Sequence, residues 1–274
     1  MLTKKLNNGV EIPVIGLGTY RIGRTDDETY YAVRKALDAG YRHIDTATLY
    51  MNEKPVGKAI RESGIARKDI FVTTKLWGSD ILSNRILEAF EGSLSNLGLD
   101  YVDLYLVHWP VKGRLGFTWR AMEQIFHAGR ARAIGLSNHL VHHMEELLQE
   151  ATVMPVVNQM ELHPYLTQNE VVAYCERKEI VTEAWSPLGS SKIPLLQEEK
   201  LKEIGEKYDK SPAQVVLRWN VDHGHVAIPK SSDAHRQIEN IDIFDFQLTT
   251  AEMNQIDALN RGYRTGIHPD EISF

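Results

Sequence analysis

The chain has 274 residues, of which 43% are hydrophobic and 25% charged, and its formal net charge is −6. This balance is typical of a globular protein with a large core and argues against disorder. The acidic charge gives no general attraction for nucleic acid or anionic membranes, so we expect neither as a partner. No shift in composition divides the chain, and we expect a single domain over residues 1–274.

The N-terminus and the cysteine content bear on the cellular location. The first residues lack the apolar stretch of a signal peptide, and no later run has the length of a membrane span. The single cysteine, Cys175, cannot form an internal disulfide and lies in a helix-like run, where we expect a buried thiol. We therefore expect a cytoplasmic protein, and a monomer because no exposed apolar repeat indicates an interface.

The predicted elements begin with a β-hairpin, since Asn8-Gly9 favours a tight turn between 4–6 and 10–12. Eight apolar or β-branched runs follow, near Ile15, His43, Phe71, Val102, Ala133, Val156, Val181 and Val226. Amphipathic runs between them predict helices over 28–39, 53–63, 84–97, 119–128, 141–150, 169–177 and 199–208. Helix starts are predicted at Ser83 and at Ser211-Pro212.

This alternation of strands and helices predicts an α/β fold with parallel strands and right-handed crossovers. Periodicity alone does not distinguish a closed barrel from an open doubly wound sheet. Eight units favour a (β/α)8 TIM barrel, with the hairpin closing its bottom. Two extra helices are predicted after the eighth strand, at 231–240 and 250–259, before a loop-like tail at 260–274.

Four ionisable residues lie at or just beyond the ends of predicted strands. Asp45, Lys75 and His108 each end such a run, and Tyr50 lies in the loop five residues after Asp45. The C-terminal ends of parallel barrel strands open on one face, where barrel enzymes carry out their chemistry. We therefore expect the four side chains to meet at one mouth.

Together these residue types suit the protonation of a carbonyl oxygen. A tyrosine pKa of about 10 makes a poor acid unless a neighbouring cation favours the tyrosinate. Lys75 can supply that cation, Asp45 can keep Lys75 charged, and His108 can orient the substrate oxygen. Taken singly, each residue also has a structural interpretation, as half of a salt bridge or as a satisfied core group. Four compatible groups favour catalysis.

The sequence has no dinucleotide fingerprint, because Arg21 stands where the third glycine belongs. A better cofactor candidate is the segment 228–232, which leads into a predicted helix. Lys230, Ser231 and the helix amides can bind a phosphate, with Arg236 about one turn further on. Solvated surface charges are the alternative interpretation.

A metal-dependent hydrolase or isomerase is a third class to weigh. No set of His, Asp and Glu has the sequence spacing of metal ligands, so we predict no metal site. The adjacent His142 and His143 are interpreted as the polar face of a helix.

Short motifs along the chain resemble the aldo-keto reductase superfamily, in that superfamily's order and from about residue 9 to residue 260. The motifs are Gly16-Leu17-Gly18-Thr19, Asp45-Thr46-Ala47 with Tyr50 and Asn52-Glu53, Thr74-Lys75-Leu76-Trp77, His108-Trp109-Pro110, Gly135-Leu136-Ser137-Asn138, Asn158-Gln159 with Glu161 and His163-Pro164, Trp185-Ser186-Pro187-Leu188, and Ile228-Pro229-Lys230-Ser231 with Arg236. The length is most similar to the prokaryotic branch that contains 2,5-diketo-D-gluconic acid reductases and methylglyoxal reductases.

The resemblance implies a barrel that binds NADPH without a Rossmann domain and reduces aldehydes or ketones, such as dicarbonyls or keto-sugars. It implies Tyr50 as general acid, Asp45 and Lys75 as its modulators, and His108 as the orienting group. The implied cofactor contacts are Gly18, Thr19 and Asp45; Ser137, Asn138 and Gln159 at the nicotinamide carboxamide; Trp185 stacked on the nicotinamide; Ser186, Pro187 and Leu188 along the pyrophosphate; Lys230, Ser231, Ser232 and Arg236 at the 2′-phosphate; and Glu239 and Asn240 near the adenine. Three positively polarised phosphate contacts favour NADPH over NADH.

Three positions depart from the family pattern. Met51 stands where glycine commonly follows the tyrosine, Tyr20 where tryptophan is frequent, and His139 where phenylalanine is usual. None lies on the implied path of the proton or the hydride, but Tyr20 and Met51 leave the identity of the substrate open.

The predicted substrate wall consists of Tyr20, Trp77, Trp109 and His108, with ordinary packing at the barrel rim as the alternative. A second functional hypothesis is a non-catalytic NADPH-binding sensor or structural protein on the same barrel, as in the potassium-channel β subunits and lens crystallins that resemble this family. The presence of all four predicted catalytic residues argues against it.

Overall fold

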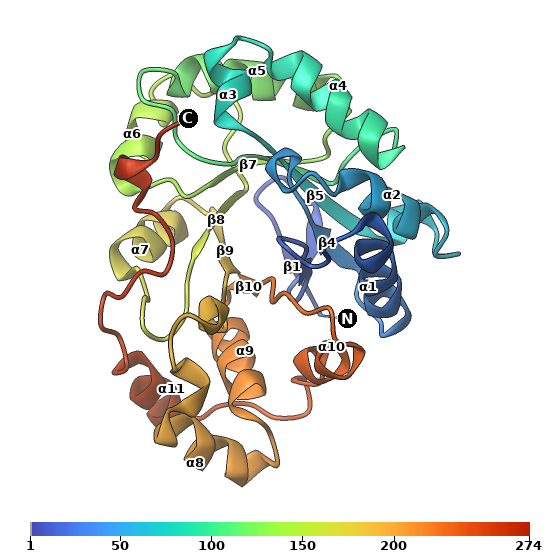
Figure 1. Ribbon diagram of the computed structural model, residues 1–274. Helices are drawn as coiled ribbons and strands as arrows, with labels where there is room; N and C mark the ends of the chain where they lie inside the picture. Colours follow the sequence, from blue (N-terminus) through green and yellow to red (C-terminus); the bar gives the residue numbers. More distant parts are fainter. Residues whose placement is uncertain (1) are drawn as a thin grey trace.

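A computed structural model describes residues 2–274. Its central feature is a sheet of eight parallel strands that neighbour one another in chain order, from β3 to β10. A parallel bridge between Ile15, two residues before β3, and Ala227 in β10 joins the two edges, so the sheet closes on itself. Helices surround the strands, as Figure 1 shows. The predicted (β/α)8 barrel is confirmed.

The barrel strands are short, and most of their side chains are buried because helices cover the sheet from outside and side chains fill it from inside. They are β3 (Leu17–Gly18), β4 (His43–Asp45), β5 (Phe71–Leu76), β6 (Leu104–Val107), β7 (Ile134–Ser137), β8 (Val157–Glu161), β9 (Val181–Trp185) and β10 (Val226–Ala227).

A helix follows each strand, as the amphipathic runs predict. The helices are α1 (Asp26–Asp38), α2 (Glu53–Arg61), α3 (Gly78–Leu82), α4 (Ile86–Leu97), α5 (Leu115–His127), α6 (Val141–Leu148), α7 (Asn169–Arg177), α8 (Glu199–Tyr208), α9 (Pro212–Asp222), α10 (Ala234–Ile241) and α11 (Thr250–Asp257). Both helices predicted after the eighth strand are present. The first, α10, serves as the eighth barrel helix, so the helices outside the repeat are α8, α11 and the short α3.

The predicted N-terminal hairpin is confirmed. Strand β1 (Thr3–Lys5) pairs antiparallel with β2 (Glu11–Pro13), with Lys4 opposite Ile12. Leu6 and Ile12 are buried in a separate apolar cluster with residues from the lower part of the barrel interior. The hairpin therefore closes the end of the barrel opposite the mouth, and burial of its apolar side chains holds it there.

One predicted helix start is confirmed and one is wrong. Ser211 caps α9, since its hydroxyl accepts a hydrogen bond from the Gln214 amide while the Gln214 side chain accepts one from the Ser211 amide. Ser83 instead ends α3, where its hydroxyl donates to the carbonyl of Ser79. The left-handed backbone of Asn84, with φ of 54°, then separates α3 from α4.

The C-terminal tail runs from α11 past α7 and α6 (Figure 1). Glu161, at the end of β8, holds it by accepting hydrogen bonds from the amides of Thr265 (2.7 Å) and Gly266 (3.0 Å). The ring of the last residue, Phe274, lies 5.2 Å from that of Trp77. The tail therefore crosses the mouth end of the barrel. Over residues 2–274, none of the helices combines the length and apolarity needed to cross a membrane.

Candidate active site

The four residues predicted for catalysis come from three neighbouring strands and one loop. Asp45 ends β4, Lys75 lies one residue before the end of β5, and His108 directly follows β6. Tyr50 ends a single 3-10 turn, Thr48–Tyr50, that follows β4. Parallel pairing of β4, β5 and β6 brings their C-terminal ends to the same face of the barrel.

The Lys75 ammonium is the centre of the cluster. It donates hydrogen bonds to Asp45 Oδ1 (2.6 Å), to the carbonyl oxygen of Thr46 (2.9 Å) and to the Tyr50 hydroxyl (3.3 Å). Lys75 and Asp45 are buried. All three protons of the ammonium are therefore used, and one of them contacts the tyrosine oxygen.

The charge on Lys75 survives burial because Asp45 lies beside it. Burial, the largest effect, works to lower the pKa of Lys75, but attraction by Asp45 and the neighbouring acidic groups raises that pKa above its ordinary value. Burial raises the pKa of Asp45, against the opposing effect of Lys75. The pair is thus an ammonium and a carboxylate that stabilise each other in a buried site.

Tyr50 differs in one respect from the sequence-based expectation. Burial raises its pKa to about 12, and the opposing effect of Lys75 does not overcome this. Tyr50 therefore carries its proton at neutral pH. It is a hydrogen-bond donor next to a cation that would stabilise the tyrosinate left after proton transfer.

His108 lies across the same opening. Its ring is 5.7 Å from that of Tyr50 and 5.3 Å from that of Trp77. Burial, with the nearby Lys75 charge, holds the pKa of His108 well below its usual range. The imidazole is therefore neutral, and its buried Nδ1 has no hydrogen-bond partner among the described residues. A neutral ring can donate one hydrogen bond to a substrate oxygen.

Two of the three aromatic residues predicted for the substrate wall flank this opening. The ring of Tyr20 is half exposed and lies 5.0 Å from that of Tyr50. Trp77 lies between the rings of His108 and Phe274. Trp109 is half-buried and makes no ring contact with this group within residues 2–274.

Gln159 connects the cluster to a buried acid that the sequence analysis did not single out. Its Nε2 donates to Asp45 Oδ2 and to Glu183 Oε2, both at 2.8 Å. Burial raises the pKa of Glu183 to about 8, so this side chain is protonated at neutral pH. Both Gln159 amide protons are used, which leaves Oε1 as the atom able to accept a hydrogen bond from a carboxamide.

Asn138 and Trp185 lie together at the mouth. The Trp185 indole donates to Asn138 Oδ1 (2.8 Å), and Asn138 Nδ2 donates to the Ser137 hydroxyl and to the carbonyl of His108, both at 3.0 Å. Asn138 therefore fixes Trp185 and the backbone beside His108. A Cβ on Gly266 would lie 2.6 Å from the Trp185 ring, so the tail needs a glycine where it passes the indole.

The loop after β9 contains Ser186, Pro187 and Leu188. Ser186 and Ser190 both have positive φ, 50° and 54°, and their hydroxyls are hydrogen-bonded to each other. The predicted contact of this loop with a pyrophosphate stays a prediction.

Lys230 and Arg236 are exposed, and neither side chain forms an ion pair within the described residues. Ser232 is also exposed, whereas the Ser231 hydroxyl is bound to the backbone of Asp233. Helix α10 begins at Ala234 rather than at 231, and the Asp233 carboxylate accepts the Arg236 amide proton. The N-terminal amides are thus partly occupied by Asp233, whereas the two cations have no ion-pair partner among the described residues.

The remaining predicted cofactor contacts are more enclosed. Glu239 accepts a hydrogen bond from the Ser211 hydroxyl, and Asn240 is buried. Gly18 packs against β10, where a Cβ would lie 2.8 Å from the carbonyl oxygen of Ile228. The buried Thr19 hydroxyl has no hydrogen-bond partner within residues 2–274.

Two features of the site escaped the sequence analysis. Glu183 was missed although a charged residue inside the apolar run 181–185 is a usable signal, because an acid in a barrel strand must be paired or protonated. The contact of Phe274 with Trp77 had no such signal, since loop residues carry no periodicity that predicts where they pack.

Known proteins share both the sequence and the fold. The sequence pattern of the Aldo/keto reductase family matches residues 14–261. A glyoxal reductase of Bacillus subtilis (strain 168) is 52% identical over 272 residues, covering 99% of this chain and 98% of that protein. The methylglyoxal reductase DkgA of Escherichia coli O157:H7 is 41% identical, covering 98% and 97%.

The solved structures agree. MGS-M4, an aldo-keto reductase from a Medee basin deep-sea metagenome library, superposes with a TM-score of 0.96 at 44% identity, over 99% of this chain and 100% of that one. An aldo/keto reductase from Brucella melitensis gives 0.90 at 50% identity, over 94% and 99%. The resemblance found in the sequence motifs is confirmed. The chain belongs to the aldo/keto reductase family.

Proposed function

We propose that the protein reduces aldehydes and ketones, dicarbonyls or keto-sugars among them, to alcohols with NADPH, and that Tyr50 is the general acid. The observation that carries this proposal is the 3.3 Å contact between the Lys75 ammonium and the Tyr50 hydroxyl in a buried cluster. The names of the related glyoxal and methylglyoxal reductases support small dicarbonyls as the first substrates to test.

The proposed roles follow from the geometry of the side chains. A substrate carbonyl oxygen would lie between the Tyr50 hydroxyl and the neutral His108 ring and accept a hydrogen bond from each. Proton transfer from Tyr50 leaves a phenolate, which the adjacent Lys75 ammonium stabilises. Asp45 keeps Lys75 protonated and in place. Trp77 and Tyr20 would hold the rest of the substrate.

Several features suit a nicotinamide cofactor with a 2′-phosphate. Gln159 has one free acceptor, Oε1, for the carboxamide, and Trp185 is held at the mouth by Asn138. Lys230 and Arg236 are cations without ion-pair partners among the described residues, as expected of phosphate ligands. NADPH, when bound, supplies the hydride that the protein's own side chains cannot.

Turnover tests the reaction class. Purified protein mixed with NADPH and methylglyoxal, glyoxal or 2,5-diketo-D-gluconate should consume the nicotinamide absorbance. Failure with a broad carbonyl panel, combined with intact NADPH binding, would favour the non-catalytic sensor hypothesis instead.

Tyr50→Phe tests the general acid. This variant removes the hydroxyl and keeps the ring, so we expect turnover to fall by about 10²- to 10⁴-fold while NADPH binding, followed by protein fluorescence, stays intact. Tyr31→Phe is the matched control, because Tyr31 is exposed on α1. Near-normal turnover in Tyr50→Phe would rule out the assignment.

Arg236→Ala tests the choice of NADPH. Loss of a charged phosphate contact should weaken NADPH binding by about tenfold or more and leave NADH binding unchanged. Lys230→Ala should act in the same direction, and Lys68→Ala, on an exposed lysine of another segment, should change neither. Equal losses for both cofactors would contradict a 2′-phosphate site.

A further inference from the structure

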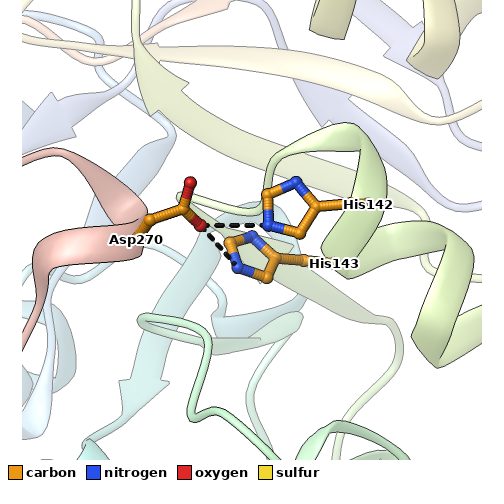
Figure 2. Close-up of side chains that lie close together, drawn as sticks. All are labelled: His142, His143 and Asp270. Atoms are coloured by element: carbon orange, nitrogen blue, oxygen red, sulfur yellow. Dashed lines mark hydrogen bonds and ion pairs between the residues drawn. The ribbon is translucent and has the colours of Figure 1, made fainter.

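Two histidines and one aspartate meet on the outside of the barrel, away from the cluster around Lys75. His142 and His143 lie in the first turn of α6, and Asp270 lies in a 3-10 turn of the tail, Pro269–Glu271. Figure 2 shows both imidazole rings turned towards the same carboxylate. The Nε2 atoms of His142 and His143 lie 3.0 and 3.1 Å from Asp270 Oδ1.

We propose that His142, His143 and Asp270 form a binding site for one divalent transition-metal ion, with Zn²⁺ as the ion of choice. Two imidazole nitrogens and one carboxylate oxygen are the ligand types that Zn²⁺ accepts, with water in the fourth position. Mg²⁺ and Ca²⁺ prefer sites made of oxygen alone. The sequence-based interpretation of the histidines as a plain polar face missed this cluster, because Asp270 lies more than a hundred residues further along the chain.

The distances favour an ion of this size. Tetrahedral ligands at about 2.0 Å from Zn²⁺ lie about 3.3 Å from one another. The three candidate ligand atoms all lie within 4.8 Å of one another, and two of the separations are already 3.0 and 3.1 Å. Two of the three separations are therefore already close to the spacing of zinc ligands.

Water can reach the fourth position. His142 and Asp270 line a cavity of about 710 Å³ between α6, α7 and the tail. His268 also faces Asp270, at 3.8 Å, but its Nδ1 accepts a hydrogen bond from the Asp270 amide. We therefore leave His268 out of the ligand set.

A hydrogen-bonded cluster without metal is the alternative. The Leu140 amide donates to His143 Nδ1 at 3.1 Å, so in the metal-free protein Nε2 carries the ring proton and donates it to Asp270. Coordination through Nε2 moves that proton to Nδ1 and ends the bond from Leu140. The site should therefore bind Zn²⁺ more weakly than a permanent structural zinc centre.

A bound ion would fasten the tail to α6. Asp270 lies four residues before Phe274, whose ring packs on Trp77 at the mouth. Zinc should therefore reduce amide hydrogen exchange across 264–274. This inference does not depend on the proposed reaction, because the site and its readouts need neither cofactor nor substrate.

The experiment is a calorimetric titration of the full chain with Zn²⁺, after chelator treatment and without a polyhistidine tag. We expect one saturable site per chain. His142→Ala and Asp270→Asn should each weaken binding by about tenfold or more, whereas His127→Ala, on an exposed histidine of α5, should not. Asp270→Asn is informative because an amide oxygen still accepts hydrogen bonds from the imidazoles but is a poor zinc ligand.

Two results would overturn the proposal. One is the absence of a saturable site in the unmodified chain. The other is equal Zn²⁺ binding by the unmodified protein and Asp270→Asn, provided that circular dichroism shows both to be folded. Either result would leave the three side chains as a hydrogen-bonded link between the tail and α6.

Discussion

Lys75 carries a positive charge where water does not reach it. Its side chain is fully buried. The charged form is stabilised by Asp45, whose carboxylate lies 2.6 Å from the Lys75 ammonium. Removing one member of such a pair leaves the other as an uncompensated buried charge, which is more damaging than removing both. Lys75 therefore contributes to the stability of the fold through its ion pair with Asp45, and separately to the proposed reaction through its contact with Tyr50.

Lys75→Met tests this separation. We expect the free energy of unfolding to fall by about 3 kcal/mol, because Asp45 loses its partner. The double variant Asp45→Asn/Lys75→Met should recover much of that loss in urea unfolding, since no charge is left unpaired. Neither variant should reduce carbonyls. A double variant no more stable than Lys75→Met would show that packing, not charge, dominates.

Glu183 should make stability depend on pH. Its folded pKa of about 8 lies above the ordinary value of 4.5, so between these values the folded protein holds a proton that the unfolded chain has lost. The stabilisation is present below about pH 4.5 and is lost as pH rises towards 8, by at most about 1.4 kcal/mol per pH unit. Glu183→Gln should flatten this slope in urea unfolding at pH 5 to 8. An unchanged slope would mean that Glu183 is ionised in the folded protein.

Some elements were predictable from apolar periodicity alone. Helices α7 and α8 have the same bounds in the sequence analysis and in the structure because each has an apolar stripe at helical spacing, although no side chain caps the first turn of either helix. The prediction at Ser83 was wrong because serine is common at helix ends and in short turns as well as at helix starts. The left-handed conformation of Asn84 is what ends α3 here, and the sequence does not reveal that conformation.

Met51 has an unusual backbone conformation beside Tyr50. It directly follows the 3-10 turn that carries Tyr50, in the left-handed conformation with φ of 55°, and its side chain is 89% exposed. Met51→Gly should change the free energy of unfolding by no more than about 1 kcal/mol, since relief of strain offsets the entropy of glycine. Met51→Val should destabilise more, because branching at Cβ is poorly tolerated at positive φ. Thermal unfolding compares the two, and equal values would contradict the argument.

At the scale of the whole molecule, the barrel has one end closed for stability and one end left open for chemistry. The hairpin buries Ile12 at the bottom, whereas the tail passes Trp185 and ends against Trp77 at the mouth. The hairpin was predictable from its turn residues. The path of the tail was not, because it rests on contacts with Glu161 that bridge about a hundred residues and follow no local pattern.

Two alanine variants should show that the bottom of the barrel governs stability and the mouth governs substrate binding. Ile12 is fully buried, so Ile12→Ala should lower the free energy of unfolding by about 2–5 kcal/mol and leave the KM for carbonyl substrates unchanged at temperatures where the protein is folded. Phe274 is 40% exposed, so Phe274→Ala should change stability by less than about 1 kcal/mol. It should shift the KM by about two- to tenfold, because Trp77 loses the ring that holds it in place. Urea unfolding and substrate titration measure both quantities. A KM shift in Ile12→Ala, measured where this variant is completely folded, would show that the bottom of the barrel is coupled to the mouth. The two ends would then not have separate roles.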